Sequence, residues 1–140
     1  MEVNSISTLM TYNPLCVFAD DPVSDVYTIM IEQDIRHVPV IDSDGRVEGV
    51  ISQRDLIKHA LFAFDDLNVL EKKANLSDLS ARSIMTPDPE TITTDIPVSE
   101  AARLLLDNKI GCLPVTDGRK IIGIVTESDF VKQVMRESEG

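Results

Sequence analysis

Apolar residues recur at intervals of three and four in two segments, residues 20–34 and 94–109, and this spacing predicts a helix in each. Pro22 and Pro97 fall in the first turn of these helices, where the missing N–H group costs little. A further helix is expected at the end of each half of the chain. Short apolar runs around the helices predict strands at residues 15–18, 37–42 and 47–52, and again at residues 90–93, 112–117 and 121–126. The predicted order is therefore β-α-β-β-α, twice.

The repeated order reflects a duplication within the sequence. Met10 aligns with Met85 at an offset of 75 residues, and many later residues are identical at the same offset. The second half lacks one residue in its Asp-Gly turn, so the offset becomes 74 and Asp55 pairs with Asp129. Two such units can pack across a pseudo-two-fold axis, and neither has to be stable alone.

The duplication divides the chain into a first repeat, residues 1–61, a linker, residues 62–80, and a second repeat, residues 81–140. The linker contains no Gly or Pro and carries spaced leucines, which predicts helical structure rather than a flexible tether. Phe62 and Phe64 near its start either pack within the chain or contact a second copy of the protein.

Charge and composition narrow the possible functions. The 140 residues include 13 basic and 24 acidic side chains, a net charge of −11, which disfavours binding to nucleic acid or anionic membranes. No apolar run is long enough to span a bilayer and no signal peptide is recognisable, so a cytoplasmic protein is expected.

Candidate catalytic chemistry is sparse. Cys16 and Cys112 lie in apolar stretches and are expected in the core. His37 and His59 form no zinc motif. Because the sequence offers no nucleophile–base pair and no metal cluster, we expect neither an enzyme nor a metal site.

The clearest repeated polar motif is Ser/Thr-x-x-Asp, which occurs as Ser52 with Asp55 and as Thr126 with Asp129. One interpretation is a capping box that begins a helix and is worth about 1 kcal/mol. The other is a binding site, because a helix N-terminus favours phosphate and a carboxylate can accept both ribose hydroxyls. The two interpretations are compatible.

The landmarks of each half are a Met-Thr pair, a later Pro-Val-Ser, and the run I-x-x-h-P-V-x-D followed by h-x-G-h-h-[ST]-x-x-D, where h is apolar. This repeat resembles the CBS domain, named after cystathionine β-synthase, and the tandem pair resembles a Bateman module in a stand-alone CBS-domain protein. The resemblance extends from Ile6 to Met135. It implies an α/β (α+β) fold in which two β-α-β-β-α repeats pack with pseudo-two-fold symmetry, leaving two clefts between them.

The family resemblance also implies ligands and partners. In the family the clefts bind adenosine-containing ligands such as AMP, ADP, ATP, S-adenosylmethionine or NADH. These are regulatory ligands rather than catalytic cofactors. The modules often form homodimers and regulate an attached or partner protein. A ligand that bridges two repeats would favour one relative orientation of them, to the extent that it binds that state better.

The resemblance assigns individual positions to the clefts, with Asp55 and Asp129 on the ribose and Ser52 and Thr126 beside them. The start of each first strand would line the cleft opposite, so that each cleft takes its Asp from one repeat and its strand entry from the other. The residues before the proline of each second strand would flank the adenine. These further positions are Thr11, Asn13 and Leu15; Thr86, Asp88 and Glu90; Ile35, Arg36 and His37; and Ile110, Gly111 and Cys112.

The two predicted clefts differ in charge. Arg36 and Arg54 belong to the cleft of Asp55, where an arginine pair suits phosphate, although acidic residues at the same rim oppose a polyphosphate. The cleft of Asp129 offers Ser128 and a glycine in place of these cations. The hypothesis is that the first cleft binds an adenine nucleotide. The second would be weaker, empty, or suited to a less anionic adenosyl ligand.

The sequence therefore predicts a regulatory module that senses an adenosyl ligand and acts on a partner protein. Two alternatives remain: a dimerisation module whose clefts bind nothing, and a divalent-cation sensor. The presence of both aspartates and both hydroxyl residues favours ligand sensing. Acid runs are usually solvated surface, which disfavours a cation sensor built on residues such as Asp42, Asp44, Asp65 and Asp66.

Overall fold

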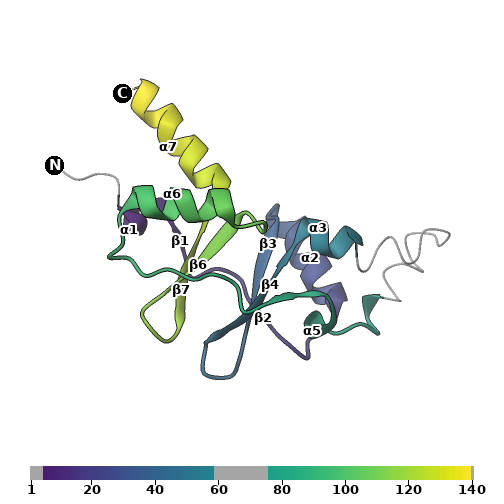
Figure 1. Cartoon of the computed structure of the whole chain (residues 1–140). Helices are drawn as coiled ribbons and strands as arrows, with labels where there is room; N and C mark the ends of the chain where they lie inside the picture. Colours follow the sequence, from purple (N-terminus) through teal and green to yellow (C-terminus); the bar gives the residue numbers. More distant parts are fainter. Residues whose placement is uncertain (1–4, 59–75, 140) are drawn as a thin grey trace. The chain divides into compact units, whose positions relative to one another are not determined.

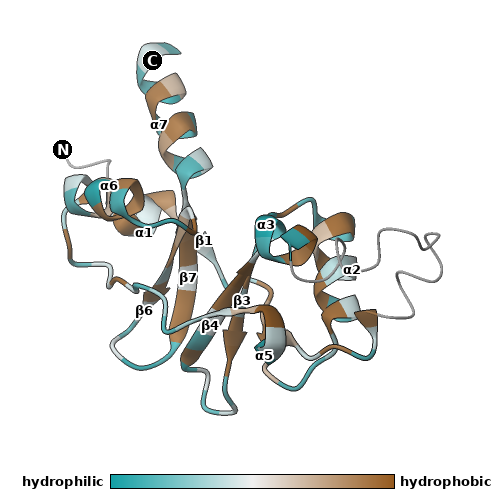
Figure 2. Cartoon of the chain, turned by 45° about the vertical axis from the view of Figure 1, so that its right-hand side comes forward, coloured by the Kyte–Doolittle hydropathy of each residue, from teal (hydrophilic) through white to brown (hydrophobic). Residues whose placement is uncertain are grey.

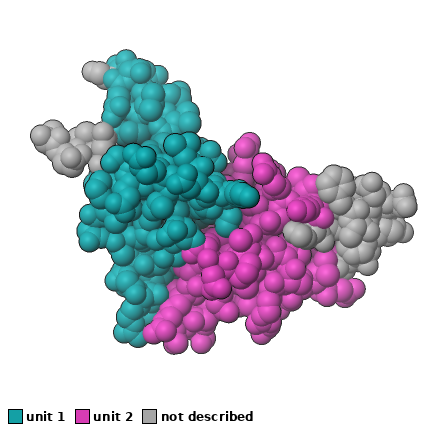
Figure 3. Space-filling model, viewed as in Figure 1, with its two compact units in different colours: residues 1–14, 90–140 teal, residues 15–89 magenta. Residues whose placement is uncertain are grey.

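The computed structural model describes residues 5–58 and 76–139 and divides the chain into two compact units. Unit 2 is Leu15–Pro89, and unit 1 combines Met1–Pro14 with Glu90–Gly140 (Figure 3). The units therefore differ from the sequence repeats, because each takes a short segment from the other repeat. Most of the predicted helical linker, including Phe62 and Phe64, lies outside the described residues.

Unit 2 contains a four-stranded sheet in the order β2-β3-β4-β5, in which β2 and β3 are parallel and the other pairs antiparallel (Figure 1). The predicted helix at 20–34 is confirmed, and Pro22 is its N-cap. The elements are β2 (Val17–Phe18), α2 (Val23–Gln33), β3 (His37–Ile41), β4 (Val47–Ser52), α3 (Gln53–Leu56), α5 (Ala81–Ile84) and β5 (Thr86–Pro87).

Unit 1 repeats this plan with a three-stranded sheet in the order β1-β7-β6. The predicted strand at 90–93 is reduced to a single bridge at Ile92, because only this residue exchanges backbone hydrogen bonds with the strand beside it. The elements are α1 (Ile6–Leu9), β1 (Thr11–Tyr12), α6 (Val98–Asp107), β6 (Cys112–Thr116), β7 (Ile121–Thr126) and α7 (Glu127–Glu139). In the described part of the chain, no helix is long and apolar enough to cross a membrane.

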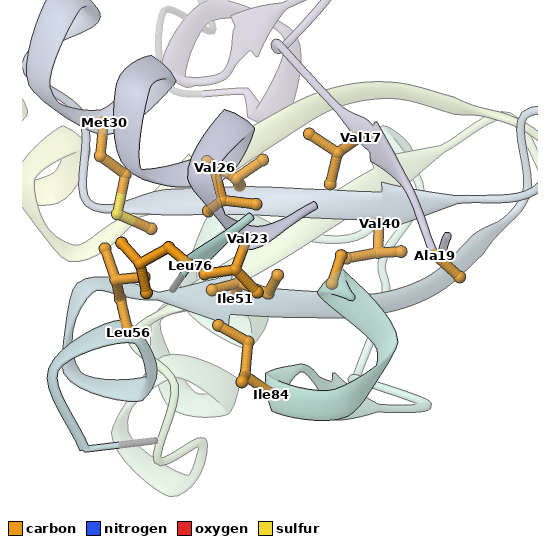
Figure 4. Close-up of a cluster of buried hydrophobic side chains, with 12 residues drawn as sticks. Val17, Ala19, Val23, Val26, Met30, Val40, Ile51, Leu56, Leu76 and Ile84 are labelled. Atoms are coloured by element: carbon orange, nitrogen blue, oxygen red, sulfur yellow. The ribbon is translucent and has the colours of Figure 1, made fainter. Parts of the chain in front are cut away.

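One face of each sheet packs against the long helix of its unit. In unit 2 the helix contributes Val23, Val26 and Met30 to a cluster with Val40 and Ile51 from the strands (Figure 4). In unit 1, helix α6 and strands β6 and β7 form the equivalent cluster. Each side chain of this kind contributes roughly 1.5–3 kcal/mol on burial, so the helix–sheet contact is the main stabilising feature of a unit.

The short strands β1 and β5 each pass very close to a glycine of the strand with which they pair. A Cβ atom on Gly49 would lie 2.6 Å from Met85 Sδ and 2.8 Å from the carbonyl oxygen of Thr86. Gly123 has the same relation to Met10, whose Sδ would be 2.6 Å away. Only a residue without a side chain permits this approach, which explains why the repeat has glycine at both positions.

Strand β4 of unit 2 and strand β7 of unit 1 each pass directly into a helix, and an aspartate in that helix bonds the end of the strand. In unit 2 the capping box is complete: Asp55 N–H donates to Ser52 Oγ at 3.0 Å, and Ser52 N–H donates to Asp55 Oδ2 at 2.9 Å. In unit 1 Thr126 N–H donates to Asp129 Oδ2 at 2.8 Å. The Thr126 hydroxyl instead bonds side chains, Ser128 Oγ at 2.9 Å and Asp129 Oδ2 at 3.3 Å. The capping interpretation is thus confirmed for the first motif.

Replacing Gly49 by alanine is expected to lower the free energy of unfolding by about 2 kcal/mol, because the new methyl group overlaps the Thr86 backbone and forces β5 away from β4. Urea denaturation followed by circular dichroism measures this loss. The neighbouring variant Glu48→Ala is the matched control and should change stability by less than about 0.5 kcal/mol. A Gly49→Ala protein as stable as the wild type would show that the pairing of β4 with β5 tolerates a side chain at this position.

The two junctions should also respond differently to loss of their hydroxyl groups. Ser52→Ala removes the acceptor of a helix N–H and is expected to cost about 1 kcal/mol of stability. Thr126→Val keeps the side-chain shape and removes a hydroxyl that bonds only side chains, so its cost should be smaller. Urea denaturation of the two variants makes the comparison, and equal losses would contradict it.

Candidate functional site

The best candidate site in unit 2 lies where β4 passes into α3. Asp55 is half-buried, and its Oδ2 atom is occupied by the Ser52 N–H group. Among the residues that the structure describes, its second oxygen, Oδ1, accepts no hydrogen bond. The junction therefore holds a carboxylate in a fixed position and leaves an acceptor for a polar ligand group.

The strand register places further predicted residues beside this carboxylate. His37 lies opposite Ser52, and Thr86 lies opposite Val50. Side chains of directly opposed residues share a face of the sheet, and so do residues two apart in one strand. His37, Ser52 and Thr86 are therefore on one face. The core residue Ile51 is on the other, which α2 covers.

The loop before β3 lies at this end of unit 2, whereas the residue after β5 lies farther along β4. The Arg36 carbonyl oxygen accepts the N–H group of Gln53, the first residue of α3, at 2.8 Å, so residues 35–37 contact the start of that helix. Asp88 follows β5 with a left-handed φ of 47°, and its N–H group donates to Glu48. The side chains of Arg36, Arg54 and Asp88 are exposed. Arg36 and Arg54 thus provide two exposed cations near the junction, whereas Asp88 lies beside Glu48, four residues before Ser52 in β4.

Unit 1 has the matching arrangement at the junction of β7 and α7. Cys112 lies opposite Thr126, and Thr11 lies opposite Ile124, so these side chains share the face that α6 does not cover. Asn13 follows β1 with a φ of 49°, in the same left-handed conformation as its counterpart after β5. Asp129 is half-buried at the helix start.

The predicted site residues are distributed between the two units. Thr86 and Asp88 belong to the same unit as Asp55, and Thr11 and Asn13 to the same unit as Asp129. Leu15 is in unit 2 and Glu90 in unit 1, so neither shares a unit with the aspartate to which it was assigned. Their role at that aspartate stays a prediction.

Backbone geometry contributes to the difference in charge between the units. Gly111 has a φ of 86°, a conformation that side chains disfavour, whereas Arg36 at the same repeat position is outside this region. The Gly111 carbonyl accepts the Glu127 N–H at 3.3 Å. Unit 1 therefore has glycine where unit 2 has a cation, and an arginine there would require a different backbone.

One residue of the site was missed by sequence reasoning. Asn108 follows α6, its Nδ2 donates to the Cys112 carbonyl at 2.7 Å, and its Oδ1 accepts the Ile110 N–H at 3.0 Å. In a sequence, an asparagine after a helix is a weak indication of a role in holding a loop, because many such residues only face solvent. Its two bonds could be recognised only from the coordinates.

The other residues considered for reactivity or metal binding lie away from these junctions. Burial raises the pKa of the Cys16 thiol to about 11, which disfavours a reactive thiolate. Asp42 Oδ1 accepts the N–H groups of Asp44 and Arg46 in a turn. Across the described ranges no group of three His, Cys, Asp or Glu residues could hold a metal ion, while His59, Asp65 and Asp66 lie outside those ranges.

Comparison with known proteins agrees with the two-repeat fold. A CBS-domain protein of Dictyostelium discoideum is 30% identical over 135 residues, covering 96% of this chain and 93% of the relative. A homoserine O-acetyltransferase of Methanosalsum zhilinae is 28% identical over 131 residues, which make up 24% of that enzyme. The crystal structure of CBSX2 in complex with AMP superposes with a TM-score of 0.75 at 29% identity, covering 96% of this chain and 98% of that one.

The family model for the CBS domain matches the chain twice, at residues 5–61 and 81–136. Each match contains one of the two strand–helix junctions described above. The predicted fold class is therefore confirmed, and the chain belongs to the CBS domain family as a tandem pair of CBS domains.

Proposed function

We propose that this protein is a regulatory module that senses an adenosine-containing ligand and transmits its presence to a partner protein. The observation that carries the proposal is the fixed carboxylate at each junction, which keeps an oxygen available in the described structure. A carboxylate held in this way suits a ribose diol, because it accepts hydrogen bonds without having to be ordered on binding. CBSX2, a relative with 29% identity, binds AMP, which supports the same ligand class here.

The two sites differ in the ligand that each would favour. We assign an adenine nucleotide such as AMP to the site of Asp55, because Arg36 and Arg54 offer charge-assisted hydrogen bonds to phosphate. We assign an adenosyl ligand without phosphate, such as S-adenosylmethionine, to the site of Asp129. The Thr126 and Ser128 hydroxyls suit a less anionic group, and the cation of unit 2 has no counterpart at Gly111.

The proposed role is regulatory rather than catalytic. Some relatives are enzymes in which a region like this chain makes up about a quarter of the length, as in the homoserine O-acetyltransferase. A ligand can shift a conformational equilibrium only as far as its affinities for the two states differ. The regulated partner would therefore recognise a ligand-dependent conformation of the module.

Separately from the regulated protein, the exposed apolar residues favour association with a second copy of the chain. Ile31 and Leu106 occupy the same repeat position on α2 and α6 and are 64% and 88% exposed. Helix α7 adds a stripe at Val131, Val134 and Met135, which are 54–60% exposed; apolar residues along this helix are visible in Figure 2. Apolar helix faces of this kind support a homodimer, which the family resemblance also implies.

The ligand assignment is tested by replacing each aspartate with asparagine. Asparagine keeps an oxygen for the capping N–H group but loses the charge, so Asp55→Asn should fold normally and bind AMP about tenfold or more weakly. Asp129→Asn is the matched control and should leave AMP binding unchanged. Thermal-shift screening with AMP, ADP, ATP, S-adenosylmethionine and NADH identifies ligands, because a ligand of the native state raises the melting temperature. Isothermal titration then gives affinities.

Two results would contradict this assignment. No shift with any of the five compounds would favour a module that binds nothing and acts through its fold. Two equal sites that Asp55→Asn leaves untouched would separate ligand binding from the carboxylate.

The homodimer is tested by Leu106→Glu, which places a charge on the most exposed apolar position of α6. Sedimentation velocity should show a dimer for the wild type and a monomer for the variant. Ser99→Glu, an exposed change on the same helix, is the matched control and should stay dimeric. A monomeric wild type, or a Leu106→Glu variant that remains a dimer, would overturn this proposal.

A further inference from the structure

The loop between α2 and β3 in unit 2 and the matching loop between α6 and β6 in unit 1 are held in two different ways. In unit 2 the main chain does so: α2 ends at Asp34 with a left-handed φ of 52°, and the N–H group of Ile35 donates to the Met30 carbonyl at 3.2 Å. In unit 1 the corresponding helix ends at Asn108, whose backbone is extended with a φ of −89° and a ψ of 123°. Lys109, at the repeat position of Asp34, is not among the described residues with a left-handed φ, so unit 1 lacks the turn that closes the first loop.

The side chain of Asn108 replaces that turn. Its Nδ2 atom donates a hydrogen bond to the Cys112 carbonyl oxygen at 2.7 Å, and its Oδ1 atom accepts one from the Ile110 N–H group at 3.0 Å. We call these two bonds the Asn108 clasp. The residue is half-buried, so water competes with the bonds less than it would at an exposed position. Gly111, with a left-handed φ of 86°, lies between the two residues that the clasp bonds.

The clasp is linked to the candidate carboxylate through the main chain. Gly111 accepts a hydrogen bond from Glu127, the first residue of α7, and Asp129 follows two residues later. This bond is 3.3 Å long, whereas the matching bond from Gln53 to Arg36 in unit 2 is 2.8 Å. The clasp thus adds two side-chain bonds to the loop whose main-chain bond to the helix start is the longer one.

We propose that Asn108 is the positioning residue of the unit 1 site. Its clasp fixes Ile110 and Gly111 beside the start of α7, and it sets the affinity for an adenosyl ligand without phosphate. The inference rests on the proposed function, because it assigns Asn108 to the site of Asp129. A loop that is ordered before binding loses less conformational entropy when the ligand arrives.

The test measures S-adenosylmethionine binding to variants that retain a single site. In an Asp55→Asn background, which leaves the unit 1 site, Asn108→Ala should weaken binding about tenfold, the loss expected for two bonds that order a loop. In an Asp129→Asn background the same substitution should leave AMP binding unchanged. Gln33→Ala, at the same repeat position and exposed at the end of α2, is the matched control and should affect neither ligand.

Amide hydrogen exchange of the protein without ligand gives a second readout. Asn108→Ala should speed the exchange of the Ile110 N–H about tenfold or more, because its acceptor is removed, while core amides such as that of Val125 keep their protection. A merely structural role would lower the protection of the whole unit and weaken both ligands together.

The outcomes separate this proposal from the function on which it rests. Faster Ile110 exchange with unchanged S-adenosylmethionine affinity would overturn the positioning role, and so would an equal loss in the Gln33→Ala control. Wild-type protein that binds AMP but not S-adenosylmethionine would also overturn it. Wild-type protein that binds no adenosyl compound would overturn the proposed function and the ligand role of Asn108. The exchange experiment alone then decides whether the clasp exists in solution.

Discussion

The pairing of β5 with β4 over Gly49, and of β1 with β7 over Gly123, is the constraint on which the rest of the structure depends. Each pairing joins segments that are far apart in the sequence, so each compact unit is completed by residues of the other repeat. The pairing requires a glycine, because a Cβ would overlap the crossing chain. It also determines the site, since it brings Thr86 and Asp88 into the unit that contains Asp55.

Under the proposed function, the aspartate at each junction combines a structural and a chemical role. One carboxylate oxygen accepts a strand-end N–H group and holds the helix start in place. The same bond orders the side chain, so the second oxygen has a defined position before any ligand binds. Capping and binding therefore do not compete, because they use different atoms. This explains how a motif as common as Ser/Thr-x-x-Asp can carry a specific function in this context.

The sequence predicted the features that repeat over many residues. Helices α2 and α6 follow from apolar spacing, and the β3–β4 and β6–β7 hairpins follow from apolar runs around Asp-Gly turns. Helices α1 and α5 and strands β1 and β5 were missed, because elements of two to four residues show no periodicity. The predicted strand at 90–93 formed only a bridge at Ile92, since a short apolar run does not determine how many partners it finds.

The sequence predicted the residues of the candidate site and a difference in charge between the two clefts, but not the loop conformations behind that difference. The alignment of Arg36 with Gly111 suggested a difference in charge, but it gave no physical reason for it. The structure supplies one in the backbone, because the bend at Gly111 favours glycine and the loop needs a second support. Asn108 provides that support through its side chain, whereas unit 2 uses a main-chain turn at Asp34. Loss of a cation and gain of a side-chain clasp are thus consequences of one change in loop conformation. Under the proposed function, a duplicated fold thus acquires two ligand preferences while keeping the aspartate at each junction.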